Sequence, residues 1–234
     1  MKLRIADWLV ALSVVPLLGG VARLAGMAGV DGQPMDTRFT QNPMPMVVHI
    51  FAASLFSVLG AFQFESRLRA AWPLWHRVAG RVLVLCGLLA AATGVWMTLA
   101  YVIPPDLQGR LLFWVRLAVG SGMAMALVLA IRAIRGGNVL RHQAWMLRAY
   151  ALGQGAGTQV LFLLPPQLLL GEAVTGMPRD LLMTAAWAAN VLIAESVLRT
   201  QETKAPRGLA SGCPRAALQQ FSHAADPATS GGTP

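Results

Sequence analysis

The sequence predicts an all-α integral membrane protein, a helical bundle of about six transmembrane helices with both chain ends in the cytoplasm. Three observations lead to this prediction: the composition, a series of long apolar runs, and the one-sided distribution of lysine and arginine. Of the 234 residues, 56% are hydrophobic and only 12% are charged, whereas a soluble domain carries roughly 25% charged residues. A chain of this composition is expected to have lipid as its main solvent.

The apolar runs are long enough to cross a bilayer. A hydrocarbon core about 30 Å thick requires about 20 mostly apolar residues in a helix. The runs cover residues 5–26, 46–64, 82–103, 111–134, 144–170 and 181–198. Turn and stop sequences such as Ile103-Pro104-Pro105-Asp106 separate them. The fifth run is overlong, and we expect Pro165-Pro166 to end or kink it early.

The basic residues indicate how the helices are oriented. With the N-terminus inside, 14 of the 19 lysines and arginines fall in cytoplasmic segments. The opposite side keeps only Arg23, Arg38, Arg110, Arg116 and Arg179. This asymmetry follows the positive-inside rule. We therefore expect a multi-pass protein of the cell (inner) membrane. The net charge of +9 reflects topology rather than nucleic-acid binding, because the basic residues are spread between apolar runs.

The two ends of the chain lead to separate expectations. Lys2 and Arg4 precede the first apolar run, which could therefore be a cleaved signal peptide. No small-x-small cleavage site follows, and Arg23 interrupts the place where one would lie, so the sequence favours a membrane anchor. From Thr200 onward the chain is rich in Ala, Gly, Ser and Pro. We expect a transmembrane bundle over residues 1–199 and a disordered cytoplasmic tail over residues 200–234.

Small residues recur at regular spacing in two of the runs. They are Gly80, Gly87 and Gly94 in the third run, and Ala149, Gly153 and Gly157 in the fifth. Because lipid provides no hydrophobic drive between helices, close approach at small residues matters for packing. We expect both faces to be helix contacts.

Two histidines lie at the predicted cytoplasmic face, His76 and His142. Imidazole is the usual axial ligand of b-type haem, so the pair could hold a single haem iron. Nearby arginines could pair with its propionates; these are Arg77, Arg81, Arg141 and Arg148. The flat porphyrin ring would then lie in a groove of small residues formed by Gly80, Gly87, Ala149 and Gly153. The hypothesis that follows is a small redox protein linked to b-type haem or quinone, with another membrane protein as a further partner.

The same residues allow two other interpretations. The inner layer could be structural or bind lipid head groups, with Glu65 and Glu195 neutralising two arginines. Alternatively, His49 and the inner layer could form a polar path in a transport-related protein, because intramembrane ionisable groups usually point into the bundle. His49, Ala53, Phe56, Gly60 and Gln63 share one face of the second run. The polar intramembrane candidates are His49, Gln63, Glu65, Tyr150, Asn190 and Glu195.

Known catalytic motifs are not found in the sequence. It has no glycine-rich phosphate loop after a strand, no Gly-x-Ser-x-Gly elbow, no His-Glu-x-x-His and no paired-cysteine metal site. No residue is therefore assigned a catalytic role, and the iron ligands His76 and His142 apply only if haem is present.

Several motifs together resemble a known family. They are His49 with Gly60-x-Phe62-Gln63-Phe64, then His76-Arg77-x-x-Gly80-Arg81, then Arg141-His142-x-x-Trp145-Met146-x-Arg148-x-Tyr150, and finally Trp187-x-x-Asn190-x-x-x-x-Glu195. Over about residues 46–198 the chain resembles the membrane proteins of domain of unknown function 2306. The resemblance implies a multi-pass architecture and no particular activity. The glycines after Tyr150 depart from the family, which more often has bulkier residues there.

The orientation can be tested with reporters. A fluorescent-protein reporter fused after Leu198 should fluoresce, because the positive-inside rule places that end in the cytoplasm. An alkaline phosphatase reporter in the loop at Asp106 should be active on the opposite side. A C-terminus outside the cytoplasm would require an odd number of crossings and would contradict the prediction.

Overall fold

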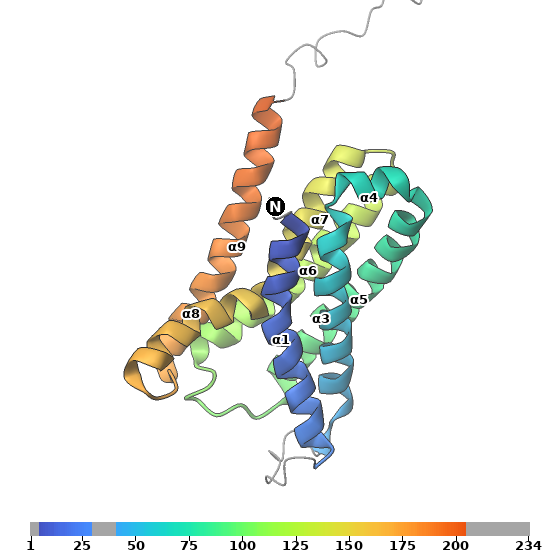
Figure 1. Ribbon diagram of the computed structural model, residues 1–234. Coiled ribbons are helices and arrows are strands. Elements are labelled where there is room, and N and C mark those ends of the chain that lie inside the picture. The colour runs from blue at the N-terminus through green and yellow to red at the C-terminus, as the bar shows by residue number, and fades with distance from the viewer. Residues whose placement is uncertain (1–4, 30–40, 205–234) are drawn as a thin grey trace, which may run out of the picture. The chain divides into compact units, whose positions relative to one another are not determined.

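A computed structural model describes residues 5–29 and 41–204, and within these ranges all the regular secondary structure is helical (Figure 1). The helices are α1 (Ile5–Met27), α3 (Met44–Gln63), α4 (Ser66–Ala71), α5 (Pro73–Ala100), α6 (Arg110–Arg135), α7 (Val139–Gly153), α8 (Gly155–Leu170) and α9 (Gly176–Lys204). The chain divides into two units, Met1–Val197 and Leu198–Pro234. The bundle lies in the first; of the second, the structure describes only the last turns of α9.

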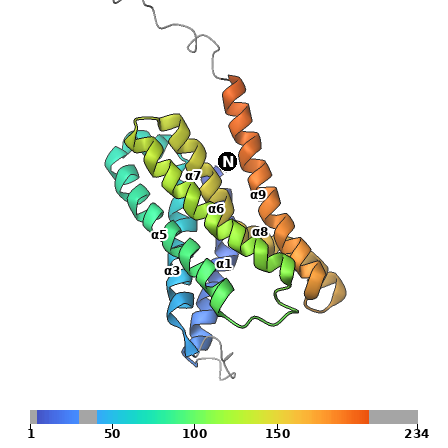
Figure 2. The same cartoon turned by 180° about the vertical axis from the view of Figure 1, so that it is seen from behind.

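Five of the described helices, α1, α3, α5, α6 and α9, are long and apolar enough to cross a membrane. Of these, α1, α3, α5 and α6 run in alternating directions, and α9 runs in the same direction as α6, as Figures 1 and 2 show. The predicted helical membrane bundle is confirmed. The short helix α4 lies across one end of the bundle, between α3 and α5.

The expected fifth span is not one continuous helix. It is divided at Gln154 into α7, with 15 residues, and α8, with 16. Figure 1 shows α8 turning away from the direction of α7. The helix does not end at the prolines, because α8 continues through Pro165 and Pro166 to Leu170; the expected kink there stays a prediction. Six crossings therefore require α7 and α8 to cross in series as one broken span, and this remains a prediction.

Two helices are longer than the apolar runs that predict them. α5 begins at Pro73, nine residues before the predicted start at residue 82. Proline suits the first helical position because the N–H it lacks would have no partner there. His76 is therefore helical. α9 continues to Lys204, and the rest of the predicted tail lies outside the described residues.

Phe56 is the central side chain of the core between α3, α5, α6 and α7. It is only 1% exposed. A Cβ atom on Gly87 would lie 2.7 Å from both Phe56 and Leu127, and one on Gly153 would lie 2.5 Å from Phe56. The Phe56 ring therefore fills the space that these glycines leave. Both small-residue faces are helix contacts, as the spacing predicted.

The N-terminus of α6 is capped by a side chain from α9. Asp180 is 1% exposed, and its carboxylate oxygens accept hydrogen bonds from the backbone N–H groups of Gly109 and Leu112, each at 3.1 Å. The first N–H groups of a helix have no partner within it, and a carboxylate there is also favoured by the helix dipole. Asp180 thereby fixes the start of α9 against the start of α6.

Replacing Gly87 by leucine should lower the free energy of unfolding by about 1–3 kcal/mol, because the added side chain would have to displace Phe56 or Leu127. Thermal unfolding in detergent would measure the change. Ala92→Leu, at an exposed position on the same helix, should leave the midpoint unchanged. Equal midpoints for the parent and Gly87→Leu would show that the Gly87 face has room for a side chain.

Candidate functional site

The structure brings His76 and His142 together at the end of the bundle that carries α4. His76 lies in the first turn of α5 and His142 in the first turn of α7. The two are close enough to interact electrostatically. His142 Nδ1 is 3.0 Å from the carbonyl oxygen of Ala130. His76 Nδ1 and Gln63 Nε2 are buried and have no hydrogen-bond partner among the described residues.

The arginines predicted for this layer do not converge on the histidines. Arg77, Arg81 and Arg141 are exposed. Arg77 Nε donates to the carbonyl of Pro73 in its own helix, at 3.4 Å. These three side chains therefore lie on the surface.

The fourth arginine, Arg148, is bound to Glu195. Arg148 Nε donates to Glu195 Oε1 at 2.6 Å, and a terminal nitrogen donates to Oε2 at 3.0 Å. The guanidinium group also lies 4.9 Å from the centre of the Trp145 ring. This bidentate pair joins α7 to α9. Glu65 instead caps α4 by accepting from the backbone N–H of Arg67.

The groove of small residues that the sequence suggested for a haem is occupied by other side chains. Phe56 and Leu127 occupy the space beside Gly87, and Phe56 with Met123 occupies the space beside Gly153. Ala149, on the same face, is completely buried. Side chains of the protein therefore occupy the space beside Gly87 and Gly153. Binding of a haem by His76 and His142 stays a prediction.

Tyr150 belongs to a buried polar chain in the middle of the bundle. Its hydroxyl donates to the carbonyl of Ser57 at 2.8 Å. Gln154 Nε2 donates to the Tyr150 hydroxyl and, at 3.1 Å, to Ser13 Oγ. Ser13 in turn donates to the carbonyl of Leu9. The chain links α1, α3 and α7 at the point where the fifth span breaks, so these polar groups are already satisfied within the protein.

Asn190 and Trp187 of α9 brace the same break. Asn190 Nδ2 donates to the carbonyl of Ala151 at 3.1 Å, and Trp187 Nε1 donates to the carbonyl of Leu152 at 3.2 Å. In a continuous helix these carbonyls would accept from the N–H groups four residues later. Asn190 also accepts from Thr158 Oγ1 of α8 at 2.8 Å. Asn190 therefore binds both sides of the break.

His49 lines a cavity in the opposite half of the bundle, away from α4. We call this the outer cavity; its volume is about 590 Å³, and side chains from α1, α3, α5, α6, α7, α8 and α9 line it. His49 Nδ1 lies 3.0 Å from both the carbonyl of Ala90 and Thr93 Oγ1. Phe56, Met123 and Leu152 form apolar parts of its wall. The side of α3 that carries His49 faces inward, as the sequence predicted.

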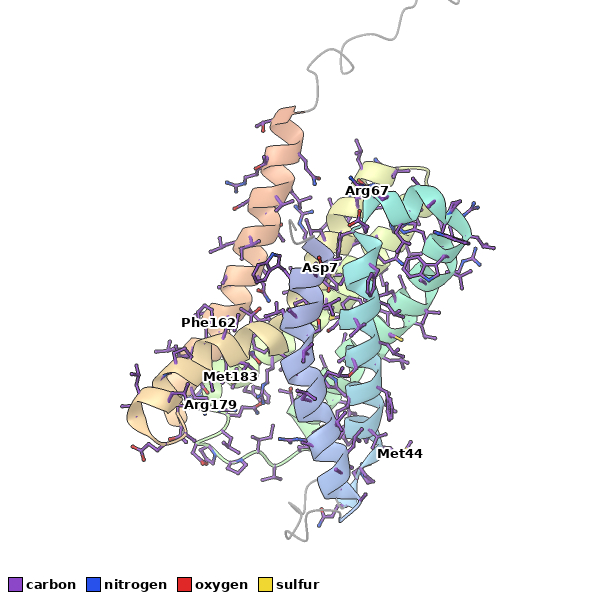
Figure 3. All side chains as sticks on the ribbon, viewed as in Figure 1. Asp7, Met44, Arg67, Phe162, Arg179 and Met183 are labelled. Atoms are coloured by element: carbon purple, nitrogen blue, oxygen red, sulfur yellow. The ribbon has the colours of Figure 1, made fainter. Side chains whose placement is uncertain are left out.

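Three arginines also line the outer cavity. Arg23 comes from α1, Arg116 from α6 and Arg179 from α9. Arg116 donates to Gln108 Oε1, and Arg179 Nε donates to the carbonyl of Leu107 at 3.3 Å. Figure 3 labels Arg179 near the end of the bundle away from Arg67.

The convergence of these arginines is not evident from the sequence, in which Arg23, Arg116 and Arg179 stand as separate charges on the predicted outer side. One signal was present: Arg116 lies six residues after Arg110 inside a 26-residue apolar helix. A charged residue within a span usually faces the bundle or a cavity.

Comparison with known proteins then places the chain in a family. Residues 46–198 match the family described as predicted membrane protein, DUF2306. The chain belongs to the DUF2306 family. No curated protein matches it, and no solved structure does.

In this DUF2306 protein, much of the resemblance is carried by residues that build contacts between helices. Trp187 and Asn190 brace the helix break, and Glu195 pairs with Arg148. His49 lines the outer cavity. The matched region begins after α1, so Arg23 and Ser13 belong to a part of the chain that the match does not cover.

Replacing Asn190 by alanine should lower the free energy of unfolding by about 1–2 kcal/mol, because the carbonyl of Ala151 and the hydroxyl of Thr158 would lose their partner inside the bundle. Denaturation in mixed micelles would measure this. Leu192→Ala, at a position 66% exposed on the same helix, is the matched control and should change stability less. Equal stability of both variants and the parent would show that the break does not need this brace.

Proposed function

We propose that this DUF2306 protein is a membrane-embedded binding protein for a small amphiphilic molecule, and that the outer cavity is its binding site. The observation that carries the proposal is a cavity of about 590 Å³ to which seven helices contribute lining residues. Small-molecule sites usually have volumes of roughly 300–1,000 Å³ and mostly apolar walls with a few polar groups.

The lining residues suit a molecule with one polar and one apolar end. Phe56, Met123 and Leu152 supply apolar surface, while His49 and Tyr101 supply polar groups. Such a ligand could keep its polar end near the membrane surface and its chain among the apolar side chains. This supports a lipid-binding or transport-related role over a redox role.

A second candidate function is quinone binding at the inner histidine layer. It is supported by one observation: Gln63 Nε2 and His76 Nδ1 are buried there without a hydrogen-bond partner among the described residues. Buried polar atoms of this kind call for an explanation, such as a bound group that accepts or donates a hydrogen bond. Quinone carbonyl oxygens could accept from Gln63.

The proposal can be tested by filling the cavity. A Cβ atom on Gly94 would lie 3.4 Å from His49 Cε1, so a leucine there would project into the cavity. The protein would be placed in phosphatidylcholine nanodiscs, and saturable binding of radiolabelled dodecanoate, dodecanol and dodecyltrimethylammonium would be measured by scintillation proximity. At least one probe should bind the parent, and Gly94→Leu should weaken that binding by about tenfold or more, a free-energy loss of about 1.4 kcal/mol.

Two further variants make the result interpretable. Ala92→Leu, on the exposed side of the same helix, should bind as the parent does. Ala53→Leu fills the cavity from α3 and should act like Gly94→Leu if the latter fails to fold. Binding that neither filling variant weakens would contradict the proposal. Decylubiquinone binding that survives Gly94→Leu and is lost in Gln63→Leu would favour the second candidate instead.

A further inference from the structure

We infer that the ligand of the outer cavity carries a head group that donates a hydrogen bond, such as the hydroxyl of an alcohol, and that His49 Nε2 accepts this bond. The inference rests on the proposed binding function and adds the chemical class of the ligand. His49 lines the cavity from α3 and contacts α5 through Nδ1. The other ring nitrogen, Nε2, is the one left for a ligand.

The contacts of Nδ1 determine the tautomer of His49. Nδ1 lies 3.0 Å from the carbonyl oxygen of Ala90. A carbonyl oxygen can only accept a hydrogen bond, so Nδ1 must carry a proton and donate it. A neutral imidazole has one N–H group, and the bond made by one nitrogen sets the state of the other. Nε2 therefore keeps its lone pair and can only accept.

The second neighbour of Nδ1, Thr93, agrees with this tautomer. Its hydroxyl oxygen lies 3.0 Å from Nδ1. The hydroxyl donates to the carbonyl of Leu89 at 2.6 Å, the shorter of its two contacts with backbone carbonyls in its own helix. A hydroxyl has one hydrogen to donate. Because that hydrogen is used on Leu89, the Thr93 oxygen can accept from Nδ1 but cannot donate to it.

His49 Nε2 has no hydrogen-bond partner among the described residues. The buried side-chain atoms that lack a partner in this part of the chain are Gln63 Nε2 and His76 Nδ1, and His49 Nε2 is not one of them. Neighbouring atoms therefore do not seal His49 Nε2, and an atom of a ligand can reach it.

A lone pair on imidazole can ligate a metal ion as well as accept a hydrogen bond. Within residues 5–29 and 41–204, no group of three or more histidine, cysteine, aspartate or glutamate side chains is placed to hold a metal ion. The surroundings of His49 therefore favour a hydrogen-bond donor as the partner of Nε2. In a site with low local dielectric, such a bond is stronger than in water, and an unpaired polar atom is more costly.

The position of His49 also sets the direction of the ligand. Phe56 lies seven residues later in α3, on the same side of the helix and about 10 Å along its axis. Phe56 and Met123 belong to the core of the bundle, and both line the cavity. A hydroxyl group bound at His49 would therefore direct an alkyl chain toward Phe56.

The inference can be tested with two probes that differ by one donor. Dodecanol has a hydroxyl group, whereas dodecyl methyl ether keeps the oxygen but cannot donate. Binding would be measured in phosphatidylcholine nanodiscs, with each affinity referred to the probe concentration in the bilayer. The parent protein should bind dodecanol about five- to tenfold more tightly than the ether. His49→Phe keeps a ring but no acceptor, so it should lower dodecanol affinity to that of the ether and change ether affinity by less than about twofold.

Two further variants serve as controls. His49→Gln supplies an amide that can donate to Ala90 and accept from the probe, so it should keep part of the preference for dodecanol. Thr93→Val removes a hydroxyl that contacts Nδ1 but is not among the residues that line the cavity. Because the Ala90 carbonyl stays in place, Thr93→Val should show the preference of the parent.

A measurement on the parent protein covers the case in which His49→Phe does not fold. Nitrogen-15 NMR of histidine-labelled protein reports the tautomer directly, and the signals lost in His49→Gln assign His49. A proton on Nδ1 with Nε2 unprotonated is expected. A proton on Nε2 alone would overturn the inference, because Nε2 would then donate.

The binding outcomes separate this inference from the proposed function. Equal affinity of the parent for dodecanol and the ether, with both weakened in Gly94→Leu, would overturn the hydrogen-bond donor while the binding site itself stands. A preference for dodecanol that persists in His49→Phe would overturn the role of His49. Absence of saturable dodecanol binding would also overturn the inference, and the proposed function would fail with it only if dodecanoate and dodecyltrimethylammonium did not bind either.

Discussion

Inside a bilayer every backbone N–H and C=O group must find its partner within the protein, and the break at Gln154 is where this chain meets that constraint most directly. The carbonyls of Ala151 and Leu152 receive hydrogen bonds from side chains of α9. The side chain of Gln154 is held by Tyr150 and Ser13. The break is therefore tied to α1, α3 and α9 at once, and the position of the last helix depends on it.

The glycines around the break make these contacts possible. Gly153 faces Phe56 on α3, Gly155 faces Trp187 on α9, and Gly157 faces the backbone of Leu12 on α1. A side chain at any of the three would overlap its neighbour. The glycine-rich stretch after Tyr150 is thus the place where helices approach from several directions. Residues on both sides of the break, Gly153 and Gln159, also form part of the wall of the outer cavity.

Much of the fold could be predicted from the sequence, because the length of an apolar run is visible along the chain; the orientation inferred from the arginines stays a prediction. The spans near α1, α3 and α6 match within a few residues. The break at Gln154 could not be predicted, since a continuous apolar run gives no local sign of it and the bonds that stabilise it come from residues more than thirty positions later.

The candidate site was predicted only in part. His76 and His142 lie close together, because both begin helices at the same end of the bundle. The arginines around them do not join them, since Arg77, Arg81 and Arg141 point to the surface and Arg148 is bound to Glu195. The outer cavity needs Arg23, Arg116 and Arg179 from three distant helices. Whether side chains from distant helices meet depends on how the helices pack. The spacing of residues along one helix does not predict this.

The cap that Asp180 provides has a consequence for how the protein is made. α6 is synthesised and can enter the membrane well before Asp180 leaves the ribosome, because 68 residues separate Leu112 from its acceptor. Until then the N–H groups at the start of α6 must rely on water or lipid head groups. Insertion of α9 would therefore supply the acceptors for this helix end, and a nascent chain stalled before α9 would keep the start of α6 uncapped by Asp180.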